Sequence, residues 1–227
     1  VSCDTVRISN CLFQSQFSSS YYLGKLYIEG SRGVLVEDNN FNDKAPIYIV
    51  SSATGYSDVR ILNNSNIKGL NSLYIISYSN HSGMKSVLEG NSFSTGYYGY
   101  VNDMRSSLDT LIFKDNSLAP PYQSAYKYEF VLSSSSALGI LKNNTFEGRT
   151  LIANGIDSIV SNRFFGAENT NVLEVEGSGA FIANNYISLG GALASTGLYV
   201  RNNTSDVKIV NNSIENIGTS VSSYALS

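Results

Sequence analysis

Two glutamates, Glu174 and Glu176, have the spacing in this chain that best suits catalytic chemistry. In an extended strand, residues two apart point to the same side and lie about 6–7 Å from each other. Carboxyl groups at that separation suit the hydrolysis of a glycosidic bond, or a weak calcium site. The alternative is that the two glutamates only keep an outer strand surface soluble. Asp103 and Arg105 form a second candidate pair, which could face across a groove.

The remaining reactive side chains give little further chemistry. The single histidine, His81, lies in a Ser- and Asn-rich stretch that we expect to be a solvated loop, without a second ligand for a metal. Cys3 and Cys11 flank an expected strand, which would hold them too far apart for a disulfide within that segment. No known catalytic or nucleotide-binding motif is present. We therefore expect no metal and no cofactor, with calcium as the alternative.

A recurring tyrosine is the feature of the sequence that most suggests a binding surface. Short apolar runs at 25–30, 47–52, 73–79 and 98–103 each carry an alternating tyrosine. If such strands stack in register, they place a column of phenol rings on the outer surface, formed by Tyr27, Tyr48, Tyr74 and Tyr100. Such a column could bind a glycan or a protein, since tyrosine offers a large apolar ring and a polar hydroxyl group. It could also only stabilise the sheet by stacking.

The same register makes further predictions. The residues expected to point inward are Leu26, Ile47, Leu73, Leu151, Leu173 and Leu198. The outer column would then continue beyond the tyrosines through Val131, Ile152, Glu174 and Tyr199. That column is mostly aromatic and aliphatic, so it does not form a cluster of carboxylates.

These strands must be positioned by a repeat that runs through the chain. A phrase of alternating apolar residues, an asparagine, one spacer and a final Phe, Ile or Leu occurs at 6–12, 34–41, 59–67, 87–93, 111–118, 139–146, 159–164, 181–187 and 207–214. Its asparagines are Asn10, Asn39, Asn91, Asn116, Asn144, Asn162, Asn185 and Asn212, with Ser65 in the slot of the third copy. The period is about 25 residues, which is typical of a solenoid.

Each repeat offers two short strands, a turn at the asparagine and a third short strand. Strands of this length cannot bury an apolar face alone, so the units must stack to close a core. At about 4.8 Å between strands, nine units give a rod on the order of 40 Å long. No helical period stands out. The sequence therefore predicts an all-β fold with about nine coils.

This pattern, across essentially the whole chain, resembles the right-handed parallel β-helix of the pectin-lyase-like superfamily. The resemblance implies that the asparagine slot is a bend in the left-handed conformation, which asparagine tolerates well. Stacked asparagine amides can also satisfy one another's hydrogen bonds. Members that process polysaccharides use carboxylates on the outer face of the first strand, with calcium in the lyases. The resemblance therefore keeps a polysaccharide lyase or glycoside hydrolase as an alternative function.

Composition narrows the function further. The net charge is −3 and the pI is about 5.2, which argues against nucleic-acid binding. The chain shows no membrane span, and its charge-poor surface, rich in Ser, Thr, Asn and Tyr, favours an extracellular location. Candidate glycosylation sites are Asn63, Asn80, Asn143, Asn202, Asn203 and Asn211.

We expect residues 1–227 to form one β-helix domain, because no shift of composition marks a linker. Strand edges at both rod ends would need cover, so we expect a segment of a longer protein or self-association through the ends. The favoured function is a non-catalytic extracellular rod: a surface adhesin, virion spike or filament component, with a surface glycan as its possible ligand. A purely structural spacer is the third hypothesis.

Overall fold

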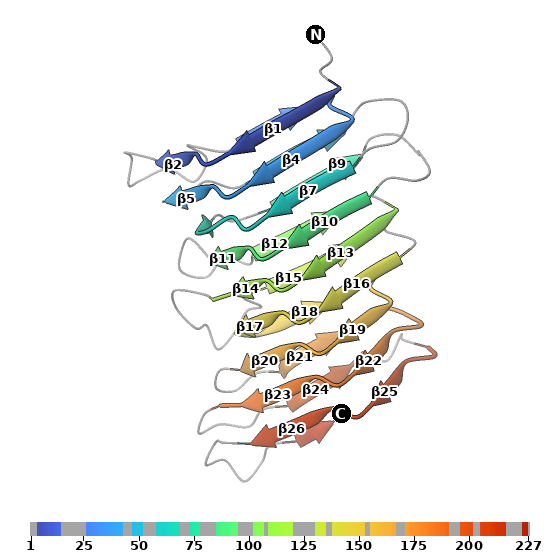
Figure 1. The fold of residues 1–227 in the computed structure, drawn as a ribbon. Coiled ribbons are helices and arrows are strands. Elements are labelled where there is room, and N and C mark those ends of the chain that lie inside the picture. Colours follow the sequence, from blue (N-terminus) through green and yellow to red (C-terminus); the bar gives the residue numbers. More distant parts are fainter. Residues whose placement is uncertain are drawn as a thin grey trace.

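The computed structural model describes residues 4–14, 26–42, 47–51, 58–68, 73–77, 85–94, 102–106, 109–119, 130–134, 138–152, 155–166, 171–190, 196–201, 205–216 and 224–226. Within these ranges every regular element is a strand, and every strand pair is parallel. The strands stack into a rod, with the N-terminus at one end and the C-terminus at the other (Figure 1). The chain is thus an all-β parallel solenoid, as the repeat predicts.

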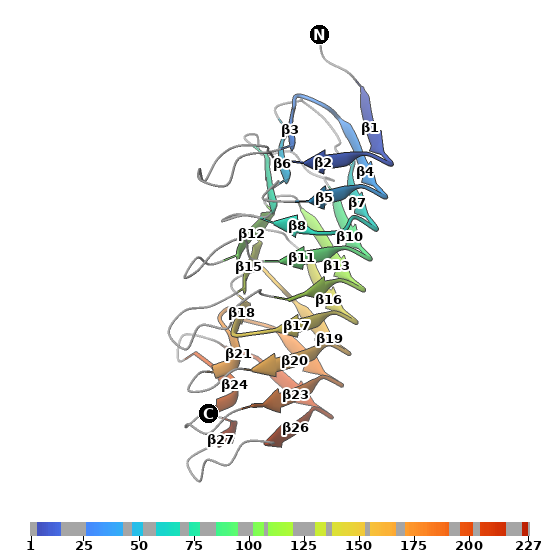
Figure 2. The same ribbon diagram turned by 90° about the vertical axis from the view of Figure 1, so that its left-hand side faces the viewer.

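Three stacked sheets form the sides of the rod (Figures 1 and 2). The first sheet contains β1 (Thr5–Ser9), β4 (Gly33–Glu37), β7 (Asp58–Leu62), β10 (Lys85–Glu89), β13 (Thr110–Lys114), β16 (Leu138–Lys142), β19 (Ser158–Val160), β22 (Phe181–Ala183) and β25 (Lys208–Val210). The second sheet contains β8 (Ile67–Lys68), β11 (Ser92–Ser94), β14 (Ser117–Leu118), β17 (Thr145–Glu147), β20 (Arg163–Gly166), β23 (Tyr186–Leu189) and β26 (Ser213–Asn216). The pair β2 (Leu12–Gln14) and β5 (Asn40–Asn42) adjoins the second sheet through a bridge between Asn40 and Ser65.

The third sheet closes the back of the rod. It contains β3 (Leu26–Glu29), β6 (Ile47–Ser51), β9 (Leu73–Ser77), β12 (Asn102–Ser106), β15 (Phe130–Ser134), β18 (Thr150–Ile152), β21 (Asn171–Val175), β24 (Thr196–Val200) and β27 (Tyr224–Leu226). From each first-sheet strand the chain passes to the second sheet, then to the third, and returns one step further along the rod. The winding is right-handed in Figure 1, which is the usual hand of a connection between parallel strands.

The bend between the first and second sheets corrects the sequence prediction in one respect. The left-handed conformation falls on the residue before the asparagine that the repeat predicts. Examples are Asp38, Asn143 and Asn184, with φ of 54°, 57° and 55°. The asparagine that follows is buried, with its amide directed inward, as Asn144 shows at 0 % exposure. The exposed first residue therefore makes the turn, and the second fills the interior.

Two slots were also assigned to the wrong residue. In the third copy the buried residue is Asn64 and not Ser65, because the extra residue lies after the bend. In the first copy Asn10 makes the bend, with φ of 55°, and Cys11 stands in register with the buried asparagines but is itself exposed. The backbone N–H of Cys11 donates to Asn39 Oδ1 at 2.9 Å. The column that follows Cys11 along the rod is Asn39, Asn64, Asn91, Asn116, Asn144, Asn162, Asn185 and Asn212.

We call the eight asparagines of this column the asparagine ladder. Each step repeats one pattern, which Asn91 illustrates. Its backbone N–H and its side-chain amide both donate to Asn116 Oδ1, at 2.9 and 3.0 Å. The other amide hydrogen donates to the carbonyl of Ile61, one strand back in the first sheet, at 2.8 Å. The ladder thus satisfies polar groups that the bend would otherwise leave buried without partners.

Aromatic residues pack next to the ladder: Phe93, Phe146 and Phe164 each follow a ladder asparagine by two positions, and Phe113 comes from β13 of the first sheet. Phe93, Phe113, Phe146 and Phe164 are all at most 1 % exposed. The rings of Phe146 and Phe164 stack with their centroids 4.9 Å apart, and those of Phe93 and Phe113 at 5.8 Å. The final apolar residue therefore enters the core in the phrases from 34–41 to 181–187, as the repeat predicts, whereas Leu12 of the first phrase is 61 % exposed.

One left-handed position is occupied by serine. Ser161 has φ of 58°, whereas comparable bends use Asn, Asp or Gly90. Serine lacks the short-range compensation that asparagine has in this conformation. We expect Ser161→Asn to raise the free energy of unfolding by about 0.5–1 kcal/mol in urea titration. The reverse change at an equivalent exposed bend, Asn184→Ser, should lower it by a similar amount, and equal stability of both variants would refute this account of the bend.

Candidate functional site

The two glutamates of the sequence prediction lie in and just after β21, a strand of the third sheet that is paired on both sides. Glu174 is in β21 and Glu176 follows that strand directly. Arg201 follows β24, the next strand in the sheet, and Arg149 precedes β18, the strand before. We call Arg149, Asn171, Glu174, Glu176 and Arg201 the Glu174 cluster.

Arginines hold both carboxylates of this cluster. Arg201 Nε donates to Glu174 Oε1, and its Nη1 donates to Glu176 Oε2 at 2.7 Å. On its other side, Glu174 Oε2 accepts from Asn171 Nδ2 at 3.3 Å and lies 3.5 Å from Arg149 Nη2. The Glu174 side chain is only 4 % exposed. One arginine therefore bridges two glutamates, while the second closes over the buried one.

This geometry suits a structural ion-pair network better than an acid–base pair. Both Glu174 oxygens are engaged and shielded from solvent, so these contacts would have to open before the carboxyl group could reach a glycosidic oxygen. Calcium would likewise have to displace Arg201 from between the two carboxylates. Within the part of the chain that the structure describes, no three His, Cys, Asp or Glu side chains come together as a metal site.

The arginines of the cluster were not singled out from the sequence, although a signal existed. Aligning Leu173 with Leu198, as the prediction does, also places Arg201 opposite Glu176. Arg149 could not be found in this way, because it lies outside the strands and reaches Glu174 from a turn.

A conservative substitution tests the structural role. Glu174→Gln keeps the shape but removes the charge between Arg149 and Arg201. We expect the free energy of unfolding to fall by about 1–2 kcal/mol, less than for a fully buried ion pair because Arg201 is 37 % exposed. Glu176→Gln, at a more exposed site, is the matched control and should cost about 0.5 kcal/mol or less. Equal losses for both variants in urea titration would argue against a special role for the buried carboxylate.

The tyrosine column is present for its first three members. Tyr27, Tyr48 and Tyr74 are register partners in β3, β6 and β9. Tyr27 is 47 % exposed, and its hydroxyl group donates to Glu29 Oε2 at 3.3 Å. Leu26 and Ile28, on either side of Tyr27, are buried, so alternation places the phenol on the outer surface, as predicted.

Beyond β9 the predicted register is wrong, by five residues at β12 and by two at β15. The residue opposite Tyr74 is Arg105, because β12 spans Asn102–Ser106 and not residues 98–103. Tyr100 lies outside the described residues. Val131, Leu151, Glu174 and Tyr199 form one register column, which Asp103 of β12 also joins. Asp103 is two residues before Arg105, so this column is not the one that contains Tyr74. The inward residue of β18 is Ile152, which joins the core, and not Leu151.

We name the register positions of Tyr27, Tyr48, Tyr74 and Arg105 the tyrosine stripe. Arg105 thus belongs to this stripe, while Asp103 lies in the neighbouring column opposite Val131. The structure agrees with the prediction at three of the residues expected to point inward. Leu73 pairs with Ile47 as expected, and Leu173 and Leu198 are fully buried. The predicted pair of Asp103 and Arg105 is therefore placed two residues apart on β12.

The remaining candidates divide by what the structure describes. Asn63, Asn143 and Asn211 are exposed, each at a left-handed bend, with φ of 54°, 57° and 52°. Cys11 is an exposed free thiol. The other predicted residues lie outside the described ranges, namely Cys3, Asn80, His81, Asn202 and Asn203.

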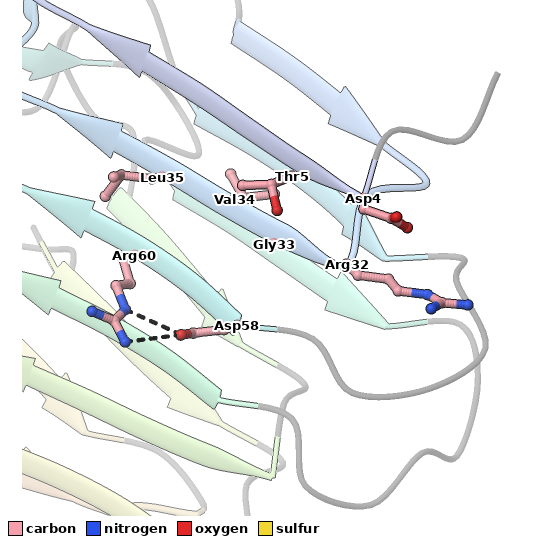
Figure 3. A pocket seen from close by; sticks show the side chains of 8 residues that line it. All are labelled: Asp4, Thr5, Arg32, Gly33, Val34, Leu35, Asp58 and Arg60. Carbon is pink, nitrogen blue, oxygen red and sulfur yellow. Dashed lines mark hydrogen bonds and ion pairs between the residues drawn. The ribbon is translucent and has the colours of Figure 1, made fainter.

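A hollow of about 550 Å³ lies elsewhere, at the starts of β1, β4 and β7 (Figure 3). Arg60 reaches Asp58 across it, with Nη2 3.0 Å from Oδ2, while Arg32 points away from this pair. The lining mixes both charges and includes Asp4, Thr5, Arg32, Gly33, Val34, Leu35, Asp58 and Arg60. The hollow therefore has no single charge that would select a ligand.

Comparison of the chain with family models, with curated proteins and with solved structures gives no match. In the ranges that the structure describes, no helix has the length and apolar character needed to cross a membrane.

Proposed function

We propose that this chain is a non-catalytic extracellular rod that binds a glycan along the tyrosine stripe. A surface adhesin, a virion spike and a filament component all fit such a rod. The observation that carries the proposal is the register of Tyr27, Tyr48 and Tyr74, which places a tyrosine at the same position in the first three strands of the third sheet.

The spacing of the stripe supports a linear ligand. Successive positions are about 4.8 Å apart along the rod, so a chain of sugars can lie along several of them at once. The apolar face of a pyranose can rest on a phenol ring while its hydroxyl groups find polar partners. Glu29 lies beside Tyr27 at one end of the stripe, where its carboxylate accepts a hydrogen bond from the phenol.

Two further features support an extracellular location. The exposed bend asparagines Asn63, Asn143 and Asn211 stand in Asn-x-Ser/Thr sequences, with acceptable access for a modifying enzyme. The pectin-lyase-like resemblance, taken as a proposal, adds that such rods occur among proteins that contact polysaccharides. The engaged state of Glu174 favours binding over cleavage.

A glycan array followed by titration of the best ligand tests the proposal. Tyr27→Ala and Tyr48→Ala should each weaken binding about tenfold, which corresponds to about 1.4 kcal/mol. Tyr186→Ala, on the second sheet, is the matched control and should leave the affinity unchanged. Unchanged binding in both stripe variants would remove the stripe as a binding surface. Turnover of a polysaccharide that Glu174→Gln abolishes would instead favour the lyase or hydrolase alternative.

A further inference from the structure

The outer face of the first sheet carries apolar residues where a solvated surface would be polar. Its central column runs through Arg7, Leu35, Arg60, Val87, Ile112, Ile140, Ser158, Phe181 and Lys208. We call its apolar members the flank stripe: Leu35, Val87, Ile112, Ile140 and Phe181. Phe181 is 41 % exposed, and Leu138, beside Ile140, is 45 % exposed.

The second sheet shows that this pattern is not general. Its outer residues in the same part of the rod are polar, among them Ser92, Ser117, Thr145 and Arg163. In β13, by contrast, Leu111, Ile112 and Phe113 form an unbroken apolar run. Such runs are typical of parallel strands that are covered on both faces. Among the described residues, nothing crosses the outer face of this sheet in Figure 1.

Most charges on this face are paired within one chain, and one pair, Lys85 and Glu89, suits a second copy of the same surface. Arg7 pairs with Glu37, Arg60 with Asp58 and Lys114 with Glu89, at 2.5, 3.0 and 2.9 Å. The face is therefore largely neutralised within one chain. Lys85 and Glu89 stand at opposite ends of β10, so a half-turn about an axis along the rod sets Lys85 of one copy against Glu89 of the other.

The face is also large enough for a stable contact. Six of its nine strands have five residues and are about 17 Å long, while β19, β22 and β25 have three residues, and strands are about 4.8 Å apart, which gives on the order of 600 Å² per partner. Stable interfaces of standard size bury about 600–1,000 Å² on each side.

We propose that the outer face of the first sheet is the contact surface of a homodimer. Two rods lie side by side and parallel, related by a two-fold axis along their length. The flank stripe of each packs on that of its partner. This contact differs from self-association through the rod ends and does not depend on glycan binding.

Sedimentation velocity from 1 to 100 µM tests the proposal, with circular dichroism and thermal melting as checks of folding. We expect the unmodified chain to show twice the 24.6 kDa of one chain. Ile112→Asp should raise the dimer dissociation constant at least 100-fold, and Phe181→Asp, at a more exposed position, at least tenfold. Ser117→Asp, in the neighbouring strand of the second sheet, is the matched control and should leave the dimer intact.

A charge exchange tests the geometry of the two-fold axis. Lys85→Glu should weaken the dimer about tenfold, and adding Glu89→Lys should restore most of that loss. A monomer at 100 µM, or a dimer that folded Ile112→Asp and Phe181→Asp variants retain, would overturn the proposal. A dimer that survives these changes but is lost on substitution in β25 or β26 would assign self-association to the rod end instead.

Discussion

Replacing Asn144 by alanine is expected to lower the free energy of unfolding by about 3–5 kcal/mol. The substitution removes the acceptor of two bonds from Asn116, whose backbone and side-chain N–H groups both donate to Asn144 Oδ1 at 2.9 and 3.1 Å. It also removes the donor to the carbonyl of Phe113, at 2.9 Å. These groups lie in the dry interior, so each loses a partner without gaining water, which is the costly case.

Urea titration followed by circular dichroism measures this loss, with the neighbouring bend residue as the control. Asn143→Gly changes the same residue type at an exposed site with φ of 57°, where glycine is tolerated, and should change the stability by less than about 1 kcal/mol. If Asn144→Ala unfolds within 1 kcal/mol of the unmodified chain, the ladder does not stabilise this fold. Asn144→Asp should cost at least as much as Asn144→Ala, because its buried carboxylate would face two acceptors, the carbonyl of Phe113 and Asn162 Oδ1.

Replacing Phe146 by alanine is expected to cost about 3–5 kcal/mol by opening a cavity in the aromatic stack. Phe146 is fully buried between Phe113 and Phe164, with ring centroids 6.5 and 4.9 Å away. Each coil contributes a single strand to each sheet. The neighbouring strands could therefore fill the cavity only by moving, which would distort the asparagine ladder beside it. We therefore expect little relaxation and a loss near the upper part of this range.

Two variants bracket the result. Phe146→Leu keeps most of the volume and should cost about 1–2 kcal/mol. Phe165→Ala, at the half-buried neighbouring position of β20, should cost about 1 kcal/mol, since less apolar area leaves water there. A loss for Phe146→Ala no larger than for Phe165→Ala would contradict the placement of Phe146 in the core.

The stacking of strands was predictable from the sequence because the repeat is local. Each phrase carries its own alternating strand, its bend and its closing apolar residue, so no long-range contact is needed to recognise it. The inward burial of Val36, Ile61 and Phe113 follows from alternation alone. The conformation of the bend is harder to predict, because two polar residues follow one another there. The sequence does not show which of the two is exposed and which is buried.

Register was predictable where an asparagine marks the bend, even across repeats as different as the 28 residues from Asn116 to Asn144 and the 18 from Asn144 to Asn162. The extra residue near Asn64 moved the slot to Ser65 when it was counted back from Ile67. In β12 the alternation of Tyr98, Gly99 and Tyr100 favoured the wrong strand, while the residue paired with Leu73 and Leu132 is Met104. The register of a strand depends on its pairing with the strands above and below it in the sheet. A local alternation of residues can therefore predict the wrong strand where pairing favours another segment.

Side-chain networks between coils were beyond the sequence argument. Arg201 is 27 residues from Glu174, and their meeting depends on the register of two strands and on a long side chain. The outer face of the first sheet was also missed, because its apolar residues occur in the same runs as the core residues. Once the strands are placed, each residue of these runs is assigned to the inner or the outer side.

Exchange of side-chain amide protons with deuterium, followed by NMR, tests the central claim that the strands stack in register along the asparagine ladder. The account predicts slow exchange for the amide protons of Asn91, Asn116, Asn144 and Asn162, since each has both hydrogens bonded inside the rod. The exposed bend residue Asn184 should exchange at the rate of a free amide. Equal, fast exchange in the ladder residues and in Asn184 would contradict it.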